Sequence, residues 1–316
     1  MTHLVNSSPV LAMMLFPLPL TTAYVAFGIV FVLGLARIFL RGDWQKARGL
    51  EKLILLGPVF YAAPIAAFGS EHWTLTTVIA AIIPRWIPWH MFWAYVVGTC
   101  FIAAGLSLVT GVQERLAAGL LGLTFFLFVV LMEAPAYTRN PQSRFGLALM
   151  LRDLTFSGGP LALTASLLAP GRERISRLLA EIARYFIAIP VLVYSFEQFL
   201  HSDHVPGVPL EPLTPTWILG HAIWTYLAAA AYAVTGALLL AGKKTRAAAT
   251  GLGLTVLIVE LAVYVPNGVV ERASLDTGFN YWADTLMFCG TTLLLAGAMP
   301  REVQVRRDAG GVTTIH

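Results

Sequence analysis

The sequence has little charge. Only 12% of its 316 residues are Asp, Glu, Lys or Arg, whereas a soluble domain carries about 25%. Hydrophobic residues make up 57% of the chain and fall in runs of about 20, long enough to cross a bilayer as helices. This composition excludes a soluble globular domain and predicts an all-α polytopic membrane protein in contact with the lipid bilayer.

The sequence also has few cysteines. Cys100 and Cys289 are the two cysteines of the chain, and both lie inside apolar runs. Without a CxxC pair, neither a redox dithiol nor a zinc motif is expected, and we interpret both as small core residues. Phosphate loops, nucleophile elbows and dinucleotide fingerprints are also absent from the sequence. The basic residues form no patch, so no nucleic-acid partner is expected.

Nine apolar stretches are predicted to span the membrane. The first, Leu18–Leu40, is expected to be a retained helix, because it lacks the basic start of a signal peptide and is followed by positive charge. The predicted spans are roughly residues 18–40, 52–69, 88–110, 115–133, 145–168, 182–200, 215–241, 246–265 and 279–298.

The basic residues predict the orientation of these spans. Sixteen of the 21 fall on one side, which the positive-inside rule makes cytoplasmic, so the N-terminus is expected outside and the C-terminus inside. The basic residues on that side are Arg37, Arg41, Lys46, Arg48, Lys52, Arg115, Arg172, Arg174, Arg177, Arg184, Lys243, Lys244, Arg246, Arg301, Arg306 and Arg307.

An internal repeat divides the chain. At an offset of 131 residues, matched pairs include Pro84 with Pro215, His90 with His221, Trp93 with Trp224, Pro135 with Pro266, Asp153 with Asp284, and Gly159 with Gly290. Four helices per copy mean an even number of crossings, which predicts parallel repeats. The expected divisions are an N-terminal helix and loop (1–49), two four-helix units (50–170 and 171–300) and a cytoplasmic tail (301–316).

The segment Phe145–Ala165 is the most unusual of the spans. It carries Arg152 and Asp153 side by side, followed by the small residues Ser157, Gly158 and Gly159. Charges within a span usually face a protein interior, and small residues allow a neighbouring helix to approach. We expect Asp153 to pair with a donor such as Arg144 or Arg152. Asp284 lies at the equivalent depth, so a polar clamp is predicted in both units.

Each unit resembles the DoxX-type four-helix membrane domain. Residues 151–159 are similar to the Lys-Asn-Leu-Thr-x-Ser-Gly-Gly-like run in the last helix of that family, and Ala183-Arg184 and residues 242–246 resemble its other conserved positions. The second unit departs from the pattern, with Phe288-Cys289-Gly290 in place of Ser-Gly-Gly. The resemblance implies a bacterial inner-membrane protein, sometimes part of a redox assembly that passes electrons to quinone.

The candidate ligand-binding residues lie near the expected outer face. For a cofactor they are His90, His221, Trp93, Trp224, Arg152, Asp153, Asp284 and Glu260, and for a metal ion Glu71, His72 and Glu197. A histidine in such a position either belongs to an interfacial aromatic belt or binds a quinone carbonyl, a metal or haem iron. Glu260 has no counterpart, since Val129 stands at the matching position.

Three functions agree with these residues. The first is an accessory or quinone-associated subunit that works with other proteins of a respiratory or redox membrane assembly. The second is a membrane protein with its own outer-facing metal or haem site. The third is a transporter of a small molecule or lipid, which parallel repeats permit. The sequence identifies no catalytic residue.

Overall fold

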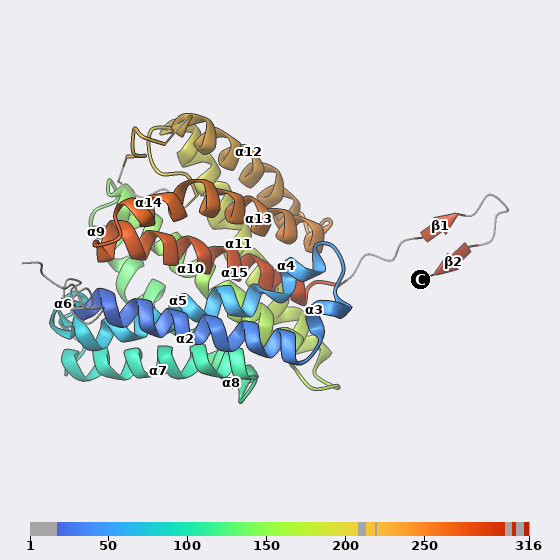
Figure 1. The fold of residues 1–316 in the computed structure, drawn as a ribbon, viewed down its shortest axis with the longest axis horizontal. Helices are drawn as coiled ribbons and strands as arrows, with labels where there is room; N and C mark the ends of the chain where they lie inside the picture. Colours follow the sequence, from blue (N-terminus) through green and yellow to red (C-terminus); the bar gives the residue numbers. More distant parts are fainter. Residues whose placement is uncertain (1–17, 208–212, 219, 301–304, 308–312, 316) are drawn as a thin grey trace, which may run out of the picture.

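The structure is a computed structural model that describes residues 18–207, 213–218, 220–300, 305–307 and 313–315. The side chains of His221 and of the last two segments lie outside the description. The described chain is almost entirely helical, which confirms the all-α class (Figure 1). Its one hairpin, near the C-terminus, pairs β1 (Val305–Arg307) with β2 (Thr313–Ile315) antiparallel.

The helices follow the expected order along the chain. In the first part they are α2 (Leu18–Leu40), α3 (Asp43–Lys46), α4 (Glu51–Leu55), α5 (Gly57–Thr74), α6 (Thr76–Ile82), α7 (His90–Thr110), α8 (Glu114–Phe128), α9 (Ala134–Arg139) and α10 (Arg144–Ser166). The second part has α11 (Glu173–Leu200), α12 (His221–Leu240), α13 (Thr245–Val259), α14 (Val265–Val270) and α15 (Tyr281–Ala298). Three segments are π-helical: η1 (Val129–Glu133), η2 (Glu260–Tyr264) and η3 (Leu275–Asn280).

Seven helices in the described residues are long and apolar enough to cross a membrane. The two other long helices, α10 and α15, are less apolar because they lie inside the bundle rather than against lipid. Fourteen of the eighteen residues of α15 are buried. α10 carries Arg152, Asp153 and the small residues around Gly158, most of them buried. Charged and polar residues of a helix in such a place can face the protein interior and find partners there.

Prolines explain two of the π-helical segments. Pro135 follows η1 and Pro266 follows η2, at matching positions. A proline has no N–H for the carbonyl four residues earlier and its ring crowds that carbonyl. The turn before each proline therefore widens from α to π geometry, which re-aims the side chains of that turn.

The two central helices hold the halves of the chain together. α10 and α15 pack against each other, and each is also covered by a helix from the other half: α11 lies on α10, and α5 lies on α15. α8 and α13 pack on α10 and α15 respectively, while α2 packs on α5 and α7 (Figure 1). The two halves are thus interlocked rather than placed side by side.

Glycines allow these close crossings. A Cβ on Gly158 would lie 2.9 Å from the Ala183 carbonyl oxygen of α11, and a Cβ on Gly290 would lie 2.5 Å from the Tyr61 amide nitrogen of α5. These distances are too short for any side chain. Gly158 of α10 and Gly290 of α15 therefore make equivalent close contacts with a neighbouring helix. The sequence offset instead matches Gly290 with Gly159, the next residue along α10.

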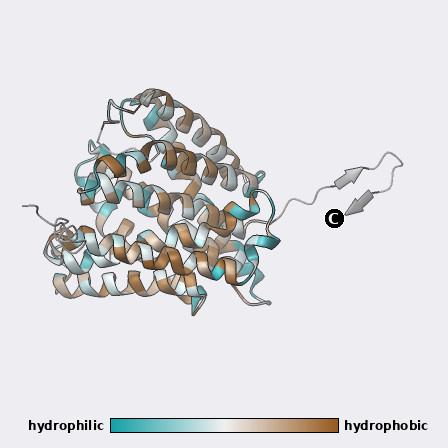
Figure 2. Cartoon of the chain, viewed as in Figure 1, coloured by the Kyte–Doolittle hydropathy of each residue, from teal (hydrophilic) through white to brown (hydrophobic). Residues whose placement is uncertain are grey.

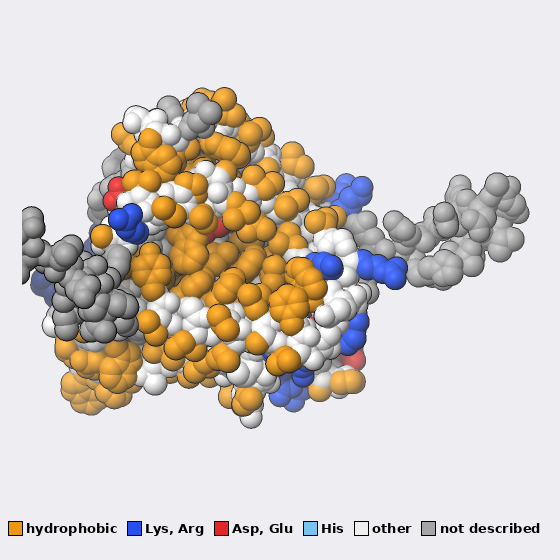
Figure 3. Space-filling model, viewed as in Figure 1, with side chains coloured by type: hydrophobic (Ala, Val, Ile, Leu, Met, Phe, Trp, Pro, Cys, Tyr) orange, Lys and Arg blue, Asp and Glu red, His pale blue; other side chains and the backbone are white. Residues whose placement is uncertain are grey.

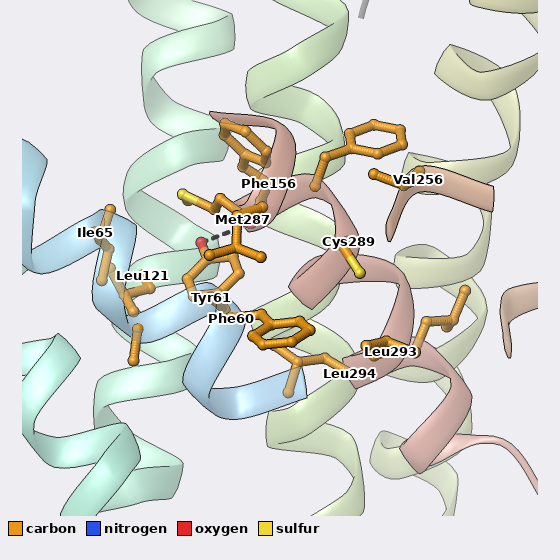
Figure 4. Packing of buried hydrophobic residues seen from close by; sticks show 14 of the residues in the cluster. Phe60, Tyr61, Ile65, Leu121, Phe156, Val256, Met287, Cys289, Leu293 and Leu294 are labelled. Atoms are coloured by element: carbon orange, nitrogen blue, oxygen red, sulfur yellow. Dashed lines mark hydrogen bonds between the residues drawn. The ribbon is translucent and has the colours of Figure 1, made fainter. Parts of the chain in front are cut away.

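The apolar core runs between α5, α10 and α15 (Figure 4). The fully buried Tyr61 reaches from α5 to α10, where its hydroxyl donates to the Phe156 carbonyl at 2.9 Å. Cys289 points into the same core and donates to the Gly253 carbonyl at 3.3 Å. The interpretation of Cys289 as a core residue is confirmed, whereas Cys100 is exposed on the surface of the bundle.

The surface agrees with a membrane environment. Apolar side chains cover the middle of the bundle, and Lys and Arg gather at the end formed by α3 and α4, which we call the basic end (Figures 2 and 3). There, Arg37 donates to the Leu108 carbonyl at 3.0 Å, Arg246 donates to the Ala296 carbonyl at 2.8 Å, and Arg184 donates to the Leu239 carbonyl. Each arginine satisfies a free carbonyl at the C-terminus of a neighbouring helix.

Helix bounds repeat along the chain at the offset found in the sequence. α8, η1 and α9 begin at Glu114, Val129 and Ala134, and α13, η2 and α14 begin 131 residues later at Thr245, Glu260 and Val265. α10 begins at Arg144 and η3 begins 131 residues later, at Leu275. After η3, the residues that make equivalent helix contacts are displaced by one position from this offset, because the wide turns of a π-helix take up an additional residue.

Candidate functional site

A cavity of about 370 Å³ is lined by residues of α5, α6, α7, α8, η1, α10, η3 and α15. α6 lies at the end of the bundle opposite the basic end (Figure 1). The wall of the cavity includes eight aromatic side chains, which are Phe68, Trp93, Phe101, Phe125, Phe128, Phe145, Phe156 and Tyr281. The polar side chains that line it are Glu71, His72, Glu133, Arg152, Asp153, Asp276, Asn280 and Asp284. An apolar hollow with a few converging polar groups is the usual form of a small-molecule site.

The Arg152 guanidinium is the centre of the polar groups. Its Nε donates to Asp153 at 3.0 Å, and one terminal nitrogen donates to Asp284 at 2.8 Å. These ion pairs offset the cost of burying charge between α10 and α15. The expected arginine partner of Asp153 is therefore confirmed. The prediction of a polar clamp in each half is wrong. Ala283 stands at the position that matches Arg152 in the repeat, and both carboxylates pair with Arg152 itself.

Three acceptor oxygens in the cavity lack donors. Glu71 accepts one hydrogen bond from the Asn280 amide at 3.3 Å, through its Oε2. Its Oε1, the Oε2 of Glu133 and the Oδ1 of Asn280 are buried and have no hydrogen-bond partner among the described residues. The His72 Nδ1 lies 2.7 Å from the Phe68 carbonyl, which can only accept, so Nε2 is an acceptor in the neutral ring.

One histidine of the candidate set, His90, does not line the cavity. His90 begins α7, and its Nε2 lies 3.2 Å from the Pro84 carbonyl, beside the connection that precedes this helix. The side chain of His221 lies outside the described residues. Trp93 lines the cavity, whereas Trp224 packs on a separate small cluster that includes Val205 and Tyr264.

Glu197 belongs to a different group of charges. Its carboxylate accepts from Arg144 Nε at 3.0 Å, and Arg144 also lies 3.1 Å from Nε2 of His204. The Nδ1 of His204 in turn lies 2.9 Å from Asp203, and this hydrogen bond lowers the pKa of the exposed Asp203 carboxyl. Arg144 is therefore not the partner of Asp153, because it ties the start of α10 to the end of α11.

Glu260 is buried alone. It is only 1% exposed, and neither carboxyl oxygen has a hydrogen-bond partner among the described residues. It opens η2, at the position of Val129 in the first half, and does not line the cavity. Its role as a ligand-binding group stays a prediction.

The predicted metal residues do not meet. Glu71 and His72 line the cavity, whereas Glu197 is paired with Arg144. The described residues contain no group of three or more His, Cys, Asp or Glu side chains placed to hold one ion.

Sequence reasoning missed Glu133, Asp276 and Asn280 as site residues. A signal for the last two was present, since Asp276, Asn280 and Asp284 recur every four residues and so share one helix face. Glu133 enters the cavity from the π-helical turn ahead of Pro135, which no spacing rule for α-helices places. Comparison of the chain with protein-family models, with curated proteins and with solved structures gave no match.

Proposed function

We propose that the chain is a DoxX-like protein of the bacterial inner membrane, and that it acts as an accessory, quinone-associated subunit of a respiratory or redox assembly. The observation that carries this proposal is the cavity, which Arg152 lines together with eight aromatic side chains. A quinone-type headgroup is a flat ring with two oxygen atoms, and it needs both features.

The aromatic wall supports the binding of a ring. Phe128, Phe145 and Tyr281 contribute to a wall that a planar ring can contact by stacking or edge-to-face packing. Ile82 of α6 and Trp93 of α7 line the cavity and are also 64% and 41% exposed on the outside of the bundle. These two exposed residues favour α6 and α7 as the side of the cavity at which a lipid-like tail on the ring would reach the membrane.

Arg152 supports the binding of a ring oxygen. Of its five N–H donors, two are held by Asp153 and Asp284, which fix the guanidinium in place. The side chain keeps 21% of its area accessible, and it borders the cavity. A hydrogen bond from a charged donor contributes about 1.5–3 kcal/mol, equivalent to roughly tenfold to a hundredfold in affinity.

The first prediction tests this role of Arg152. The purified protein in lipid nanodiscs should bind a benzoquinone with a short alkyl tail, measured by equilibrium dialysis. Arg152→Gln should weaken binding at least about tenfold, because a charged donor is lost. Arg144→Gln is the matched control, since Arg144 lies on the same helix but pairs with Glu197 outside the cavity. A folded Arg152→Gln protein with unchanged affinity would contradict the proposal.

We further propose that α10 and α15 also span the membrane, which makes nine spans in two parallel four-helix repeats after α2. The matching bounds of α8 to α9 and α13 to α14 support the repeat. The burial of α10 and α15 at the centre of the bundle supports their place as spans shielded from lipid. The basic end would then face the cytoplasm and the cavity would face outward.

A further inference from the structure

The polar groups of the cavity are unbalanced toward acceptors. Five carboxyl groups line it together with a single guanidinium. The donors of that guanidinium are partly used by Asp153 and Asp284, while Glu71 Oε1, Glu133 Oε2 and Asn280 Oδ1 receive no donor from the described residues. Buried acceptors without donors are costly. A bound molecule that carries donors therefore gains hydrogen bonds at these three oxygens.

This imbalance distinguishes the two redox forms of a ring ligand. The two oxygens of a quinone can only accept, so one that bonds to Arg152 leaves the other facing further acceptors. The two hydroxyls of a hydroquinone accept and donate, so one molecule can accept from Arg152 and donate to a carboxylate. A ligand that displaces water from such a site without replacing its donors loses affinity.

We infer that the cavity binds a ring ligand in its reduced, hydroxyl-bearing form, a hydroquinone, with Glu71, Glu133 and Asn280 as the acceptors of its hydroxyl protons. The choice of a quinone-type ring rests on the proposed function. The preference for the reduced form rests on the three acceptor oxygens, which come from α5, η1 and η3 and border one cavity.

Three probes with the same ring and alkyl tail test the inference. They are the hydroquinone, the corresponding quinone and the dimethyl ether of the hydroquinone, which keeps the shape but has no donor. Binding to the full chain in nanodiscs is measured anaerobically by equilibrium dialysis. The hydroquinone should bind at least about tenfold more tightly than either of the other two, because only it supplies donors to the three unpaired acceptor oxygens.

Variants assign the preference to particular side chains. Glu133→Gln replaces one acceptor oxygen by a donor amide, so affinity for the hydroquinone should fall several-fold while affinity for the quinone does not. Glu71→Gln should act in the same direction. Glu197→Gln is the matched control, because Glu197 pairs with Arg144 away from the cavity. A merely structural role of Glu133 would change the binding of both forms equally.

The outcomes separate this inference from the proposed function. Equal or tighter binding of the quinone, or binding of the dimethyl ether as tight as that of the hydroquinone, overturns the inference and leaves the proposed function standing. Failure of all three probes to bind the folded protein overturns both. A hydroquinone preference that persists unchanged in Glu133→Gln and Glu71→Gln also overturns the assigned acceptors.

Discussion

The ion pairs of Arg152 with Asp153 and Asp284 connect the two halves of the molecule. Asp153 and Asp284 come from different halves of the chain, yet both accept hydrogen bonds from the same guanidinium. The arrangement needs one arginine and not two, because α10 and α15 are in direct contact. A buried charge held by opposite charges is stable, whereas removal of Asp153 leaves the Arg152 Nε without its acceptor.

The Asp153→Ala variant should therefore lose stability. Breaking a buried ion pair costs about 3–5 kcal/mol in soluble proteins, and the Asp153 side chain is only 6% exposed. We expect a marked fall in folded yield and in the unfolding midpoint of the detergent-solubilised protein, followed by circular dichroism. Normal yield and stability would show that the charged stretch of α10 is incidental to folding.

Asp203→Ala is the exposed counterpart of that change. The hydrogen bond from His204 lowers the pKa of Asp203 in the folded protein. A lowered folded-state pKa contributes stability that is present above the unfolded value of about 3.9 and is lost as the pH falls through the folded pKa. Since Asp203 lies in an exposed loop, its loss at neutral pH should affect stability far less than the loss of Asp153.

At the scale of the helix, glycine decides which surfaces can meet. Gly290 of α15 lies against the backbone of α5, and Gly158 of α10 lies against the backbone of α11. The small-residue patch of α10 was predicted to be a place of close approach, and this is confirmed. Which helix would approach could not be predicted, because the patch specifies a shape and not a partner.

A matched pair of glycine substitutions tests this packing. Gly290→Ala should destabilise the fold by about 1–3 kcal/mol, because a Cβ would lie 2.5 Å from the Tyr61 amide nitrogen and a helix would have to move. Gly28→Ala in α2 should be neutral or stabilising, because nothing lies within 4 Å of the added carbon and alanine favours the helix by about 1 kcal/mol. The measurement is the unfolding midpoint of both variants, and a stable Gly290→Ala protein would contradict the close crossing.

At the scale of the whole molecule, the two ends differ in chemistry. The basic end has arginines that bind helix C-terminal carbonyls, such as Arg37 and Arg246, while the other end has the aromatic, carboxylate-lined cavity. A bilayer has two unlike sides, so this asymmetry favours one orientation of the bundle.

Reporter fusions test the proposed orientation. A reporter that is active only in the cytoplasm should work when fused after Arg307 and should be silent when fused after Val205, because the two positions lie on opposite sides of the membrane in the nine-span arrangement. A reporter active only outside serves as the control and should give the reverse pattern. Cytoplasmic activity at both positions would rule out the arrangement.

Composition and the lengths of apolar runs determined the class of this protein, because a bilayer accepts only segments of a certain length whose backbone groups are satisfied internally. They also indicated Arg152 and Asp153, since charge within such a segment needs a partner. Tertiary structure alone decided that Asp284 shares that arginine, that Glu133 and Asn280 enter the same cavity, and that Glu197 and Glu260 do not. These meetings depend on the widened turns of η1 and η3 and on the crossing of α10 with α15, which no local pattern encodes.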